Sequence, residues 1–301
     1  KIYNKTKAPI LFWLADSAAF TGGCHFTWDC KGYMNNCGNC PGINSANPHD
    51  LTYRNMQLKQ KTFEAIKLFP VYGTDRQKQM LSESSLFKEK QIFKAPVPID
   101  KDLFNCVDKN NVRNELGLPL EKKILLIAVQ EFLNVRKGFG ILLQSLKKLK
   151  DLLSSIERAE ILLVSCGNHF DAFSADLPFE NKHLGYLTQA EFSKVLSCAD
   201  IFISPSIEDP GPMVINQALM CGTPVVAFDI GVASEVIQTG VTGYRAVSGD
   251  INDMAEGIRY LLNLDQSKKQ MISENCRELA VKNFSREKVA GDFYQIIENL
   301  I

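Results

Sequence analysis

Unbroken apolar runs alternate with stretches of helical periodicity in the part of the chain beyond Asn110. Strands buried on both faces and separated by amphipathic helices are typical of a parallel sheet covered by helices on both sides. We therefore predict a doubly wound α/β domain from Asn110 to about Phe284, followed by a helix with Ser285 at its N-cap. The predicted strands are Lys122–Gln130, Ala159–Gly167, Lys182–Leu187, Asp200–Ser206 and Thr223–Asp229, and the predicted helices are Lys137–Leu153, Thr188–Ala199 and one from Pro212 that stops at Gly222.

The first hundred residues follow this pattern less regularly. Pro9–Asp16, Phe69–Asp75 and Gln91–Asp100 contain the apolar runs of short strands, and Thr52–Leu68 reads as a helix with basic residues on one side. The prolines and aspartates of Ala95–Asn105 predict a hinge. We expect three parts, at residues 1–105, 106–284 and 285–301, the last of which crosses back to the first.

Charge and cysteine content narrow the classes of protein. Lys plus Arg and Asp plus Glu number 34 each, so no net charge favours nucleic acid as a partner. No apolar run approaches the length of about 18 residues that spans a bilayer, and the start does not read as a signal peptide. The scattered cysteines read as small core residues in a reducing compartment, which predicts a cytoplasmic protein. They are Cys106, Cys166, Cys198, Cys221 and Cys276.

A carboxylate pair, Glu208 and Asp209, follows the predicted strand Asp200–Ser206 and precedes the loop Gly211–Pro212. In open α/β sheets, ligands bind beyond the carboxyl ends of the strands. The free N–H groups of Met213 and Val214 at the helix start are suited to phosphate oxygens. The alternative is that the two carboxylates only cap the helix and complement its dipole.

This stretch resembles the signature of retaining glycosyltransferases of the GT-B fold, specifically glycosyltransferase family 4. Aligned on the run CGTPVV, Asp209 takes the family's first acidic position and Glu208 an acidic position just before it. The resemblance implies that Asp209 faces the donor sugar and that Gln217 stands where a second Glu binds the ribose of the nucleotide. Gln217 departs from the pattern, since an amide is a weaker hydrogen-bond acceptor than a carboxylate.

Two further loops extend the resemblance. NVRKGFGILLQSL resembles the family's phosphate-binding loop, which makes Lys137 the lysine for the donor diphosphate and Arg136 its assistant. GVASEVIQTGVTGY resembles the next loop, with Glu235 as its acidic residue. Glu131 stands where many members have an Arg, a second departure. Because protein cations would balance the diphosphate, no divalent ion is implied.

Four cysteines crowd into a loop of the N-terminal part, at Cys24, Cys30, Cys37 and Cys40. The spacing C-x5-C-x6-C-x2-C suits a closed tetrahedral thiolate site for structural Zn²⁺, with His25 as an alternative ligand. One or two disulfides, or unligated thiols, remain open as alternatives.

The loop also resembles a Thr-Gly-Gly-Cys-His loop found in family members that build bacterial capsular polysaccharides and exopolysaccharides. In those relatives a His-Asp pair precedes the loop, and the matching positions here are Ala15 and Asp16. The resemblance assigns Asp16 to the catalytic site, while Ala15 lacks the side chain that faces the reacting centre. It also implies that the front third of the enzyme is absent from this chain, or that the protein is a natural short form.

Taken together, the resemblance implies a metal-independent transferase. Its donor would be a nucleoside diphosphate sugar and its acceptor a saccharide or a lipid-linked saccharide. Residues 1–105 would be a partial acceptor-side domain and 106–284 the nucleotide-sugar domain. The basic residues of the 52–68 helix would reach the inner face of the membrane or, alternatively, only line a solvated face. Two other functions stay open: a nucleotide-sugar-binding protein with little transfer, and a sugar-nucleotide epimerase.

Overall fold

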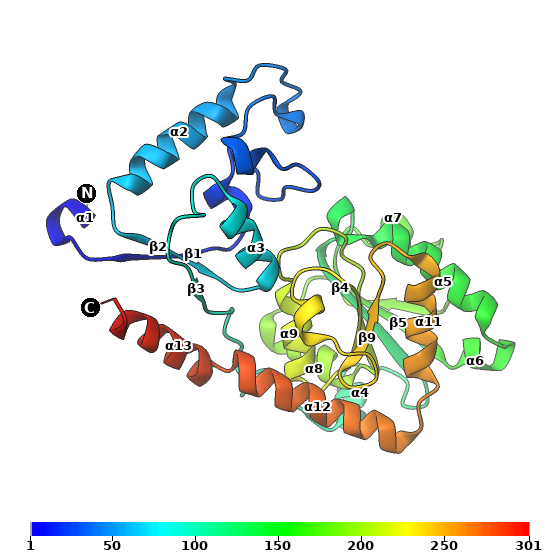
Figure 1. The fold of residues 1–301 in the computed structure, drawn as a ribbon. Helices are drawn as coiled ribbons and strands as arrows, with labels where there is room; N and C mark the ends of the chain where they lie inside the picture. The colour runs from blue at the N-terminus through cyan, green and yellow to red at the C-terminus, as the bar shows by residue number, and fades with distance from the viewer. Residues whose placement is uncertain (1, 301) are drawn as a thin grey trace. The chain divides into compact units, whose positions relative to one another are not determined.

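The structure, a computed structural model, describes residues 2–300. The chain divides into two compact units (Figure 1). One extends as far as Val97 and includes the C-terminal segment from Val289, and the other is Pro98–Lys288. The divisions fall after Val97 and Lys288. The sequence had led us to expect them after residues 105 and 284.

The predicted hinge is tied to the second unit by hydrogen bonds. The amide of Ile99 donates to the carbonyl of Phe284 at 2.7 Å, and the guanidinium of Arg277 donates to the carbonyls of Lys101 and Phe104 at 3.0 and 2.6 Å. These contacts explain why the chain joins the second unit as early as Pro98.

The second unit is built on a six-stranded sheet in the order β6-β5-β4-β7-β8-β9, with every neighbouring pair parallel. The central strands are almost wholly buried, as their unbroken apolar sequences predict. The doubly wound α/β arrangement is therefore confirmed. The strands are β4 (Lys123–Glu131), β5 (Ile161–Asn168), β6 (Asn181–His183), β7 (Ile201–Ser204), β8 (Val225–Phe228) and β9 (Gly243–Ala246).

Helices cover both faces of this sheet (Figure 1). One layer contains α5 (Phe139–Leu152), which packs on α11 (Ile251–Leu262). The other contains α8 (Gln189–Cys198) and α9 (Met213–Met220), with α4 (Lys109–Glu115) and α12 (Gln266–Phe284) packed against them. The short helices α6 (Ser155–Ala159), α7 (Asp171–Ser174) and α10 (Ala233–Val236) complete the unit.

The first unit has a three-stranded parallel sheet in the order β1-β2-β3. Its strands are β1 (Ile10–Trp13), β2 (Leu68–Tyr72) and β3 (Phe93–Lys94), and its helices are α1 (Ile2–Thr6), α2 (Leu51–Glu64) and α3 (Asp75–Glu83). The helix predicted to end at Leu68 ends at Glu64, because Leu68 already pairs with Ile10 in the sheet. Short 3-10 turns occupy Ser17–Phe20, Gly32–Asn35 and Pro41–Ile43.

The C-terminal helix α13 (Arg286–Glu298) starts where the sequence predicts. The amide of Lys288 donates to the Ser285 hydroxyl at 3.4 Å, a weak N-cap bond. From Val289 onward the helix belongs to the first unit: the Phe293 ring lies 5.4 Å from the Trp13 ring, and Ile296 is buried with Val71.

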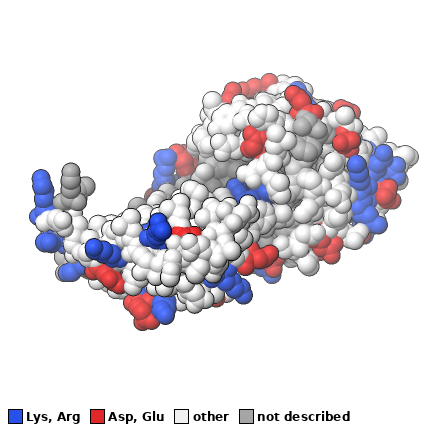
Figure 2. Space-filling view, turned by 90° about the horizontal axis from the view of Figure 1, so that it is seen from above, with Lys and Arg blue, Asp and Glu red and all other residues white. Residues whose placement is uncertain are grey.

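On the face seen in Figure 2, small groups of Lys and Arg and of Asp and Glu are scattered among uncharged residues, and neither sign dominates. Within residues 2–300, no helix combines the length and apolar character needed to cross a bilayer.

Candidate functional site

Lys137 and Asp209 meet at the carboxyl edge of the six-stranded sheet. Nζ of Lys137 lies 2.7 Å from Oδ2 of Asp209, although the residues are 72 positions apart. Lys137 follows β4 and Asp209 follows β7, and these strands are parallel neighbours in the sheet. The two predicted loops therefore lie side by side.

The loops contact each other through their backbones as well. The amide of Ile207 donates to the Arg136 carbonyl at 2.8 Å, and Nη1 of Arg136 donates to the Glu208 carbonyl at the same distance. Gly138 has a φ of +68°, and a Cβ there would lie 1.8 Å from the Pro205 carbonyl oxygen. Only glycine allows this approach, so Gly138 sets how closely Lys137 comes to the second loop.

The carboxylate of Asp209 is partly buried and oriented from two sides. Its side chain is 10% exposed; Oδ1 accepts a hydrogen bond from the Gly211 amide at 3.1 Å, and Nη1 of Arg136 lies 3.7 Å from Oδ2. Glu208 beside it is also buried. Two cations and two carboxylates thus share one loop pair.

The start of α9 lies next to these charges. Pro212 is the N-cap residue rather than the first helical residue that we expected, and its side chain offers no hydrogen bond to the helix. Met213 and Val214 line a cavity of about 210 Å³ together with the ends of β4 and β5. Free amides at a helix start attract anions, so this end of the cavity favours a phosphate.

Gln217 lies deeper in the same cavity and has a partner that the sequence did not reveal. Its Nε2 donates to Oε1 of Gln189 at 3.1 Å, and both residues line the cavity. Gln189 opens α8, directly after its N-cap Thr188. In the sequence, the only local sign of this role of Gln189 is that a polar residue follows the short strand β6. Together the two amides present donors and acceptors without a net charge.

The cavity also depends on a glycine in β5. Gly167 has a φ of +133°, and a Cβ there would lie 1.7 Å from the Val129 carbonyl oxygen. Gly167 and Cys166 line the cavity together with Met213. Burial raises the pKa of the Cys166 thiol to about 12, so it is a neutral wall group rather than a nucleophile.

The loop that carries Glu235 reaches the same edge. Gly231 has a φ of +52°, and a Cβ there would lie 2.4 Å from the Asp209 carbonyl oxygen. Glu235 is half-buried in α10, one turn further along. The predicted third loop is therefore adjacent to the Asp209 loop through its backbone.

Glu131, one of the departures from the family pattern, is hydrogen-bonded to a histidine. Its carboxylate oxygens lie 2.8 and 2.9 Å from Nδ1 of His169. His169 makes this contact from a backbone with a φ of +61°. Such a positive φ is costly for a residue other than glycine. The pair gives Glu131 a structural partner at the strand end.

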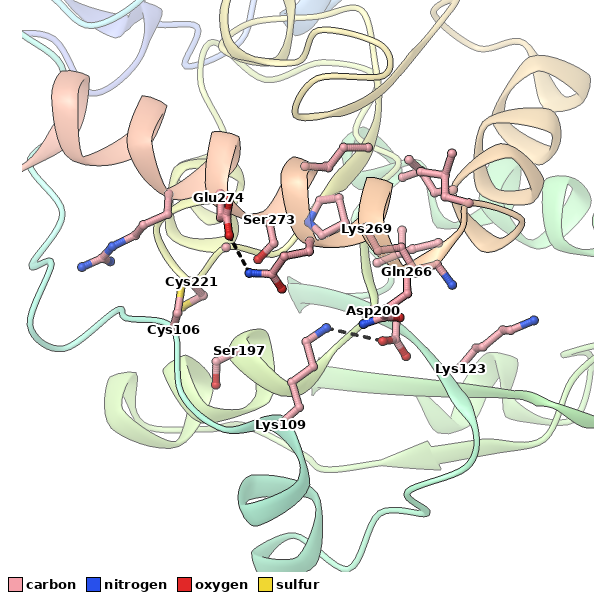
Figure 3. A pocket seen from close by; sticks show the side chains of 18 of the residues that line it. Cys106, Lys109, Lys123, Ser197, Asp200, Cys221, Gln266, Lys269, Ser273 and Glu274 are labelled. Atoms are coloured by element: carbon pink, nitrogen blue, oxygen red, sulfur yellow. Dashed lines mark hydrogen bonds and ion pairs between the residues drawn. The ribbon is translucent and has the colours of Figure 1, made fainter.

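A larger cavity, of about 680 Å³, lies at the opposite end of the sheet (Figure 3). Asp200, just before β7, and Lys123, the first residue of β4, line it together with Lys109 and Lys269. Asp200 is bound by Arg113 at 2.8 Å and by Lys109 at 3.4 Å. This cavity is separate from the Lys137 and Asp209 site, because it opens at the amino ends of the strands.

In the first unit, Asp16 follows β1 and contacts His25. Oδ2 of Asp16 lies 2.6 Å from Nδ1 of His25, and Oδ1 accepts from the Ala18 amide at 2.7 Å. Ala15 is exposed and has only a methyl group to offer. The sequence pattern did not indicate that His25 returns to Asp16, since nine residues separate them.

The four cysteines of the loop share one neighbourhood. Burial raises the pKa of Cys24 and Cys37, and the nearby thiols, including Cys30 and Cys40, raise it further. The Gly22 amide donates to Sγ of Cys37 at 3.2 Å. All four are free thiols, and residues 2–300 contain no group of three or more His, Cys, Asp or Glu side chains arranged to hold a metal ion. The zinc site stays a prediction.

The scattered cysteines divide into two classes. Cys166, Cys198, Cys221 and Cys276 are buried, as expected for small core residues, and burial raises the pKa of each. Cys106 is exposed, so its assignment to the core was wrong. It belongs to the segment that connects the hinge to α4, where the chain runs along the surface of the large cavity.

Comparisons with known proteins agree with this geometry. The family model described as "Glycosyl transferases group 1" matches residues 108–278. N-acetyl-alpha-D-glucosaminyl L-malate synthase of Bacillus anthracis is 26% identical over 206 residues, which are 67% of this chain and 52% of that protein. The chain thus spans about half the length of this relative.

Solved structures show the same fold. Sucrose-phosphate synthase of Thermosynechococcus elongatus matches with a TM-score of 0.69 at 21% identity, over 86% of this chain and 65% of that chain. Anabaena HepE in complex with UDP and glucose matches with a TM-score of 0.69 at 18% identity, over 99% and 73%. These neighbours confirm the α/β fold class of GT-B type. The family match covers more than half of the chain, with the Lys137 and Asp209 loops inside it, and the protein therefore belongs to the glycosyl transferases group 1 family.

Proposed function

We propose that this protein is a retaining, metal-independent glycosyltransferase of the family 4 type. It would move a sugar from a nucleoside diphosphate donor to a saccharide or lipid-linked acceptor in bacterial surface polysaccharide synthesis. The observation that carries the proposal is the 2.7 Å contact between Lys137 and Asp209 beside the free start of α9. A lysine, an arginine and helix amides at one strand edge make a site for a diphosphate.

The chemistry follows from the charges at this edge. During transfer the bond between the sugar C1 and the phosphate oxygen breaks, and the electron pair leaves with the diphosphate. The acceptor hydroxyl forms the new bond to C1 and passes its proton to the departing phosphate oxygen. Lys137 and Arg136 would stabilise the negative charge that builds on the leaving group. The amides of Met213 and Val214 would add fixed dipoles, while Asp209, with Glu208 beside it, would orient the sugar.

The cavity below the helix start is suited to the nucleoside. Its volume of about 210 Å³ fits part of a nucleoside, and Gln217 with Gln189 offers neutral hydrogen-bonding groups for ribose hydroxyls. The solved neighbour in complex with UDP and glucose supports UDP as the first nucleotide to test.

The first test is titration of the protein with UDP, GDP, UDP-glucose and GDP-mannose by calorimetry. In Lys137→Ala we expect donor affinity or turnover to fall on the order of 10²-fold, because a fixed positive charge at the leaving group is lost. Lys148→Ala is the matched control, since Lys148 is an exposed lysine further along α5. Unchanged binding and turnover in Lys137→Ala would refute the site.

A second candidate function is nucleotide-sugar binding without transfer. Three observations favour it: Ala15 has no hydrogen-bonding side chain, Gln217 carries no charge, and Glu131 is paired with His169. Product analysis separates the two candidates. Donor binding with neither transfer nor hydrolysis of the sugar would support this alternative and remove the transferase.

Two structural roles are proposed for the first unit. The loop thiols Cys24, Cys30, Cys37 and Cys40 would bind structural Zn²⁺, with disulfides as the alternative. Elemental analysis after purification under reducing conditions tests this, and less than about half an equivalent of zinc would remove the proposal. We also propose peripheral contact of α2 with anionic lipid. Lys59 does not contribute to it, because its Nζ donates to the carbonyls of Ala18 and Thr21.

A further inference from the structure

Three lysines from separate elements line the large cavity at the amino ends of the strands (Figure 3). Lys109 is the first residue of α4, Lys123 is the first residue of β4, and Lys269 lies in the first turns of α12. The whole lining belongs to the unit Pro98–Lys288. Because like charges repel, a cavity that collects cations from three elements is stabilised when an anion enters it.

Two of these lysines have partners within the fold. Nζ of Lys109 lies 3.4 Å from Oδ1 of Asp200, whose other oxygen accepts from Nη2 of Arg113 at 2.8 Å. Nζ of Lys123 lies 2.9 Å from the Glu160 carboxylate, but the two side chains are 32% and 45% exposed. Such exposed pairs contribute little and separate readily. The buried charge of Asp200 is thus already shared by two cations.

The third lysine, Lys269, has no such partner. Across residues 2–300, its ammonium group forms neither an ion pair nor a hydrogen bond, although the side chain is half-buried. Burial lowers the pKa of Lys269; Asp200 raises it, whereas Lys123 and Lys109 lower it further. The ammonium group is therefore partly removed from water and lies among like charges.

The acidic residues of the lining lie farther along α12. Glu274 accepts from Nε2 of Gln270 at 2.7 Å, and Glu278 lies on the next turn. Since an α-helix rises 1.5 Å per residue, they follow Lys269 by about 7.5 and 13.5 Å along the helix axis. The start of a helix also carries the positive end of its dipole. The cavity is therefore cationic near the start of α12 and acidic farther on.

Much of the remaining wall is apolar and belongs to the core. Ile201, Leu261, Leu262 and Ile272 line the cavity and are at most 5% exposed as residues, so they are held in place by packing. The volume of about 680 Å³ is within the range of about 300–1,000 Å³ that is typical of small-molecule sites. The cavity can therefore hold an organic molecule and not only an inorganic ion.

We propose that this cavity binds a small organic phosphate, with the phosphate group at Lys269 and an apolar part against the leucine and isoleucine side chains of the wall. Lysine binds phosphate as a point charge. A phosphate ester carries nearly two negative charges near neutral pH, so it balances several lysines better than a carboxylate does. The site is separate from the Lys137 and Asp209 site and does not depend on the proposed transferase function.

The test is calorimetric titration with phenyl phosphate near about pH 8, where its second proton is lost. Inorganic phosphate, benzoate and phenol are the comparison probes. Lys269→Gln removes the charge, and Lys269→Arg keeps it. Lys268→Gln is the matched control, because Lys268 is the neighbouring lysine on α12, is 61% exposed and lies outside the described lining of the cavity. Lys137→Ala reports binding at the candidate donor site instead.

We expect phenyl phosphate to bind the wild type, Lys269→Arg, Lys268→Gln and Lys137→Ala with similar affinity. Lys269→Gln should bind it about tenfold more weakly, because a charge-assisted contact is lost. Inorganic phosphate lacks the apolar part, benzoate has a single charge and phenol has none, so each should bind the wild type more weakly than phenyl phosphate. UDP affinity should show the opposite pattern, with a loss in Lys137→Ala and none in Lys269→Gln.

A measurement without ligand supports the same test. Lys269→Gln removes a charge that its neighbours repel, so its urea midpoint should equal or exceed that of the wild type. A lower midpoint would show that the charge of Lys269 is already balanced within the fold, which would count against the site.

Equal affinity of phenyl phosphate for the wild type and Lys269→Gln would overturn the proposal. So would phenol that binds as tightly as phenyl phosphate, because the lysines would then have no role. A loss in Lys137→Ala alone would place the phosphate in the donor site, and the absence of binding at about 10 mM phenyl phosphate would leave an affinity too weak for a site. Failure to bind UDP is a separate result, which would remove the proposed function and leave this site standing.

Discussion

Single glycines decide how closely the candidate donor site closes. Gly138, Gly167 and Gly231 each have a positive φ, and a Cβ on any of them would overlap a carbonyl oxygen of a neighbouring loop or strand. Each therefore allows two backbones to approach at the carboxyl edge of the sheet. Two of them, Gly138 and Gly231, approach the loop that carries Asp209, whose carboxylate lies 2.7 Å from Lys137.

Gly138→Ala tests this at one position. With a φ of +68° and a Cβ only 1.8 Å from the Pro205 oxygen, alanine has to displace the lysine loop. We expect the free energy of unfolding to fall by about 1–3 kcal/mol, and donor binding to weaken. Gly140→Ala is the control: no atom lies within 4 Å of its Cβ, so it should be neutral or stabilising by about 0.5–1 kcal/mol. Equal urea midpoints for the two variants would contradict the argument.

At the scale of elements, two charged sites lie at opposite ends of the parallel strands. The carboxyl ends hold Lys137 and Asp209, whereas Asp200 before β7 lies with Arg113 and Lys109 at the amino ends. Asp200 also accepts from the Ile124 amide at 2.8 Å, which ties β4 to the start of β7. The first pair lies in the candidate donor site, and the second group is a structural link.

Asp200→Asn should weaken the fold in a pH-dependent way. Burial raises the pKa of this carboxyl, but Lys109 and Arg113 outweigh it and hold the pKa below its usual range. Because the pKa of Asp200 is lower in the folded than in the unfolded protein, the ionised carboxylate stabilises the fold at pH values above the unfolded pKa of about 3.9. This stabilisation is lost as the pH falls through the folded pKa. We expect a loss of about 1.5–3 kcal/mol in unfolding free energy near neutral pH.

The control for this measurement is Asp151→Asn, an exposed carboxylate on α5. Urea unfolding of both variants and the wild type is compared near neutral pH and again below about pH 4. The loss of unfolding free energy in Asp200→Asn relative to the wild type should be smaller at the lower pH. The control Asp151→Asn should show no loss at either pH. A difference that is the same at both values would show that charge pairing is not its cause.

At the scale of the whole molecule, the chain consists of two compact units with different degrees of regularity. The unit Pro98–Lys288 contains the whole of the family match and the candidate donor site. The other unit contributes the cysteine loop, the Asp16 and His25 pair, and the C-terminal turns of α13. The candidate donor site therefore lies within one unit.

This division predicts where UDP protects the backbone. Saturation at about a hundred times the dissociation constant adds about 2.7 kcal/mol to the state that binds. Amide hydrogen exchange should slow in the unit Pro98–Lys288, most of all in the Arg136–Gly138 and Asp209–Val214 segments. Protection by UDP alone that is equally strong in residues 2–97 would contradict the assignment.

The periodic pattern was sufficient for the second unit. Continuous apolar runs predicted β4, β5, β7 and β8 to within two or three residues, because strands buried on both faces are made almost entirely of apolar residues. The order of strands along the chain then placed the lysine loop and the Asp209 loop at one edge, since parallel neighbours end on the same side. For these two loops, their positions after strands in the sequence and the topology of the sheet lead to the same placement.

Other contacts had no such local signal. Gln217 and Gln189 are 28 residues apart, and their hydrogen bond exists only because α8 and α9 pack in one layer. The end of α2 at Glu64 was missed because the propensity of the chain did not show that Leu68 pairs with β1. Cys106 was assigned to the core from its apolar neighbours, although only tertiary packing decides which residues of a connecting segment are covered.

The amino-acid sequence by itself determined the α/β class, the strands of the larger unit and the two charged loops, because periodicity and turn residues act over a few neighbouring positions. Tertiary structure decided the rest: the 2.7 Å meeting of Lys137 with Asp209, the amide pair in the cavity, and the return of His25 to Asp16. Those contacts join residues that are separate in the chain, so they follow from how backbones pack and not from local composition.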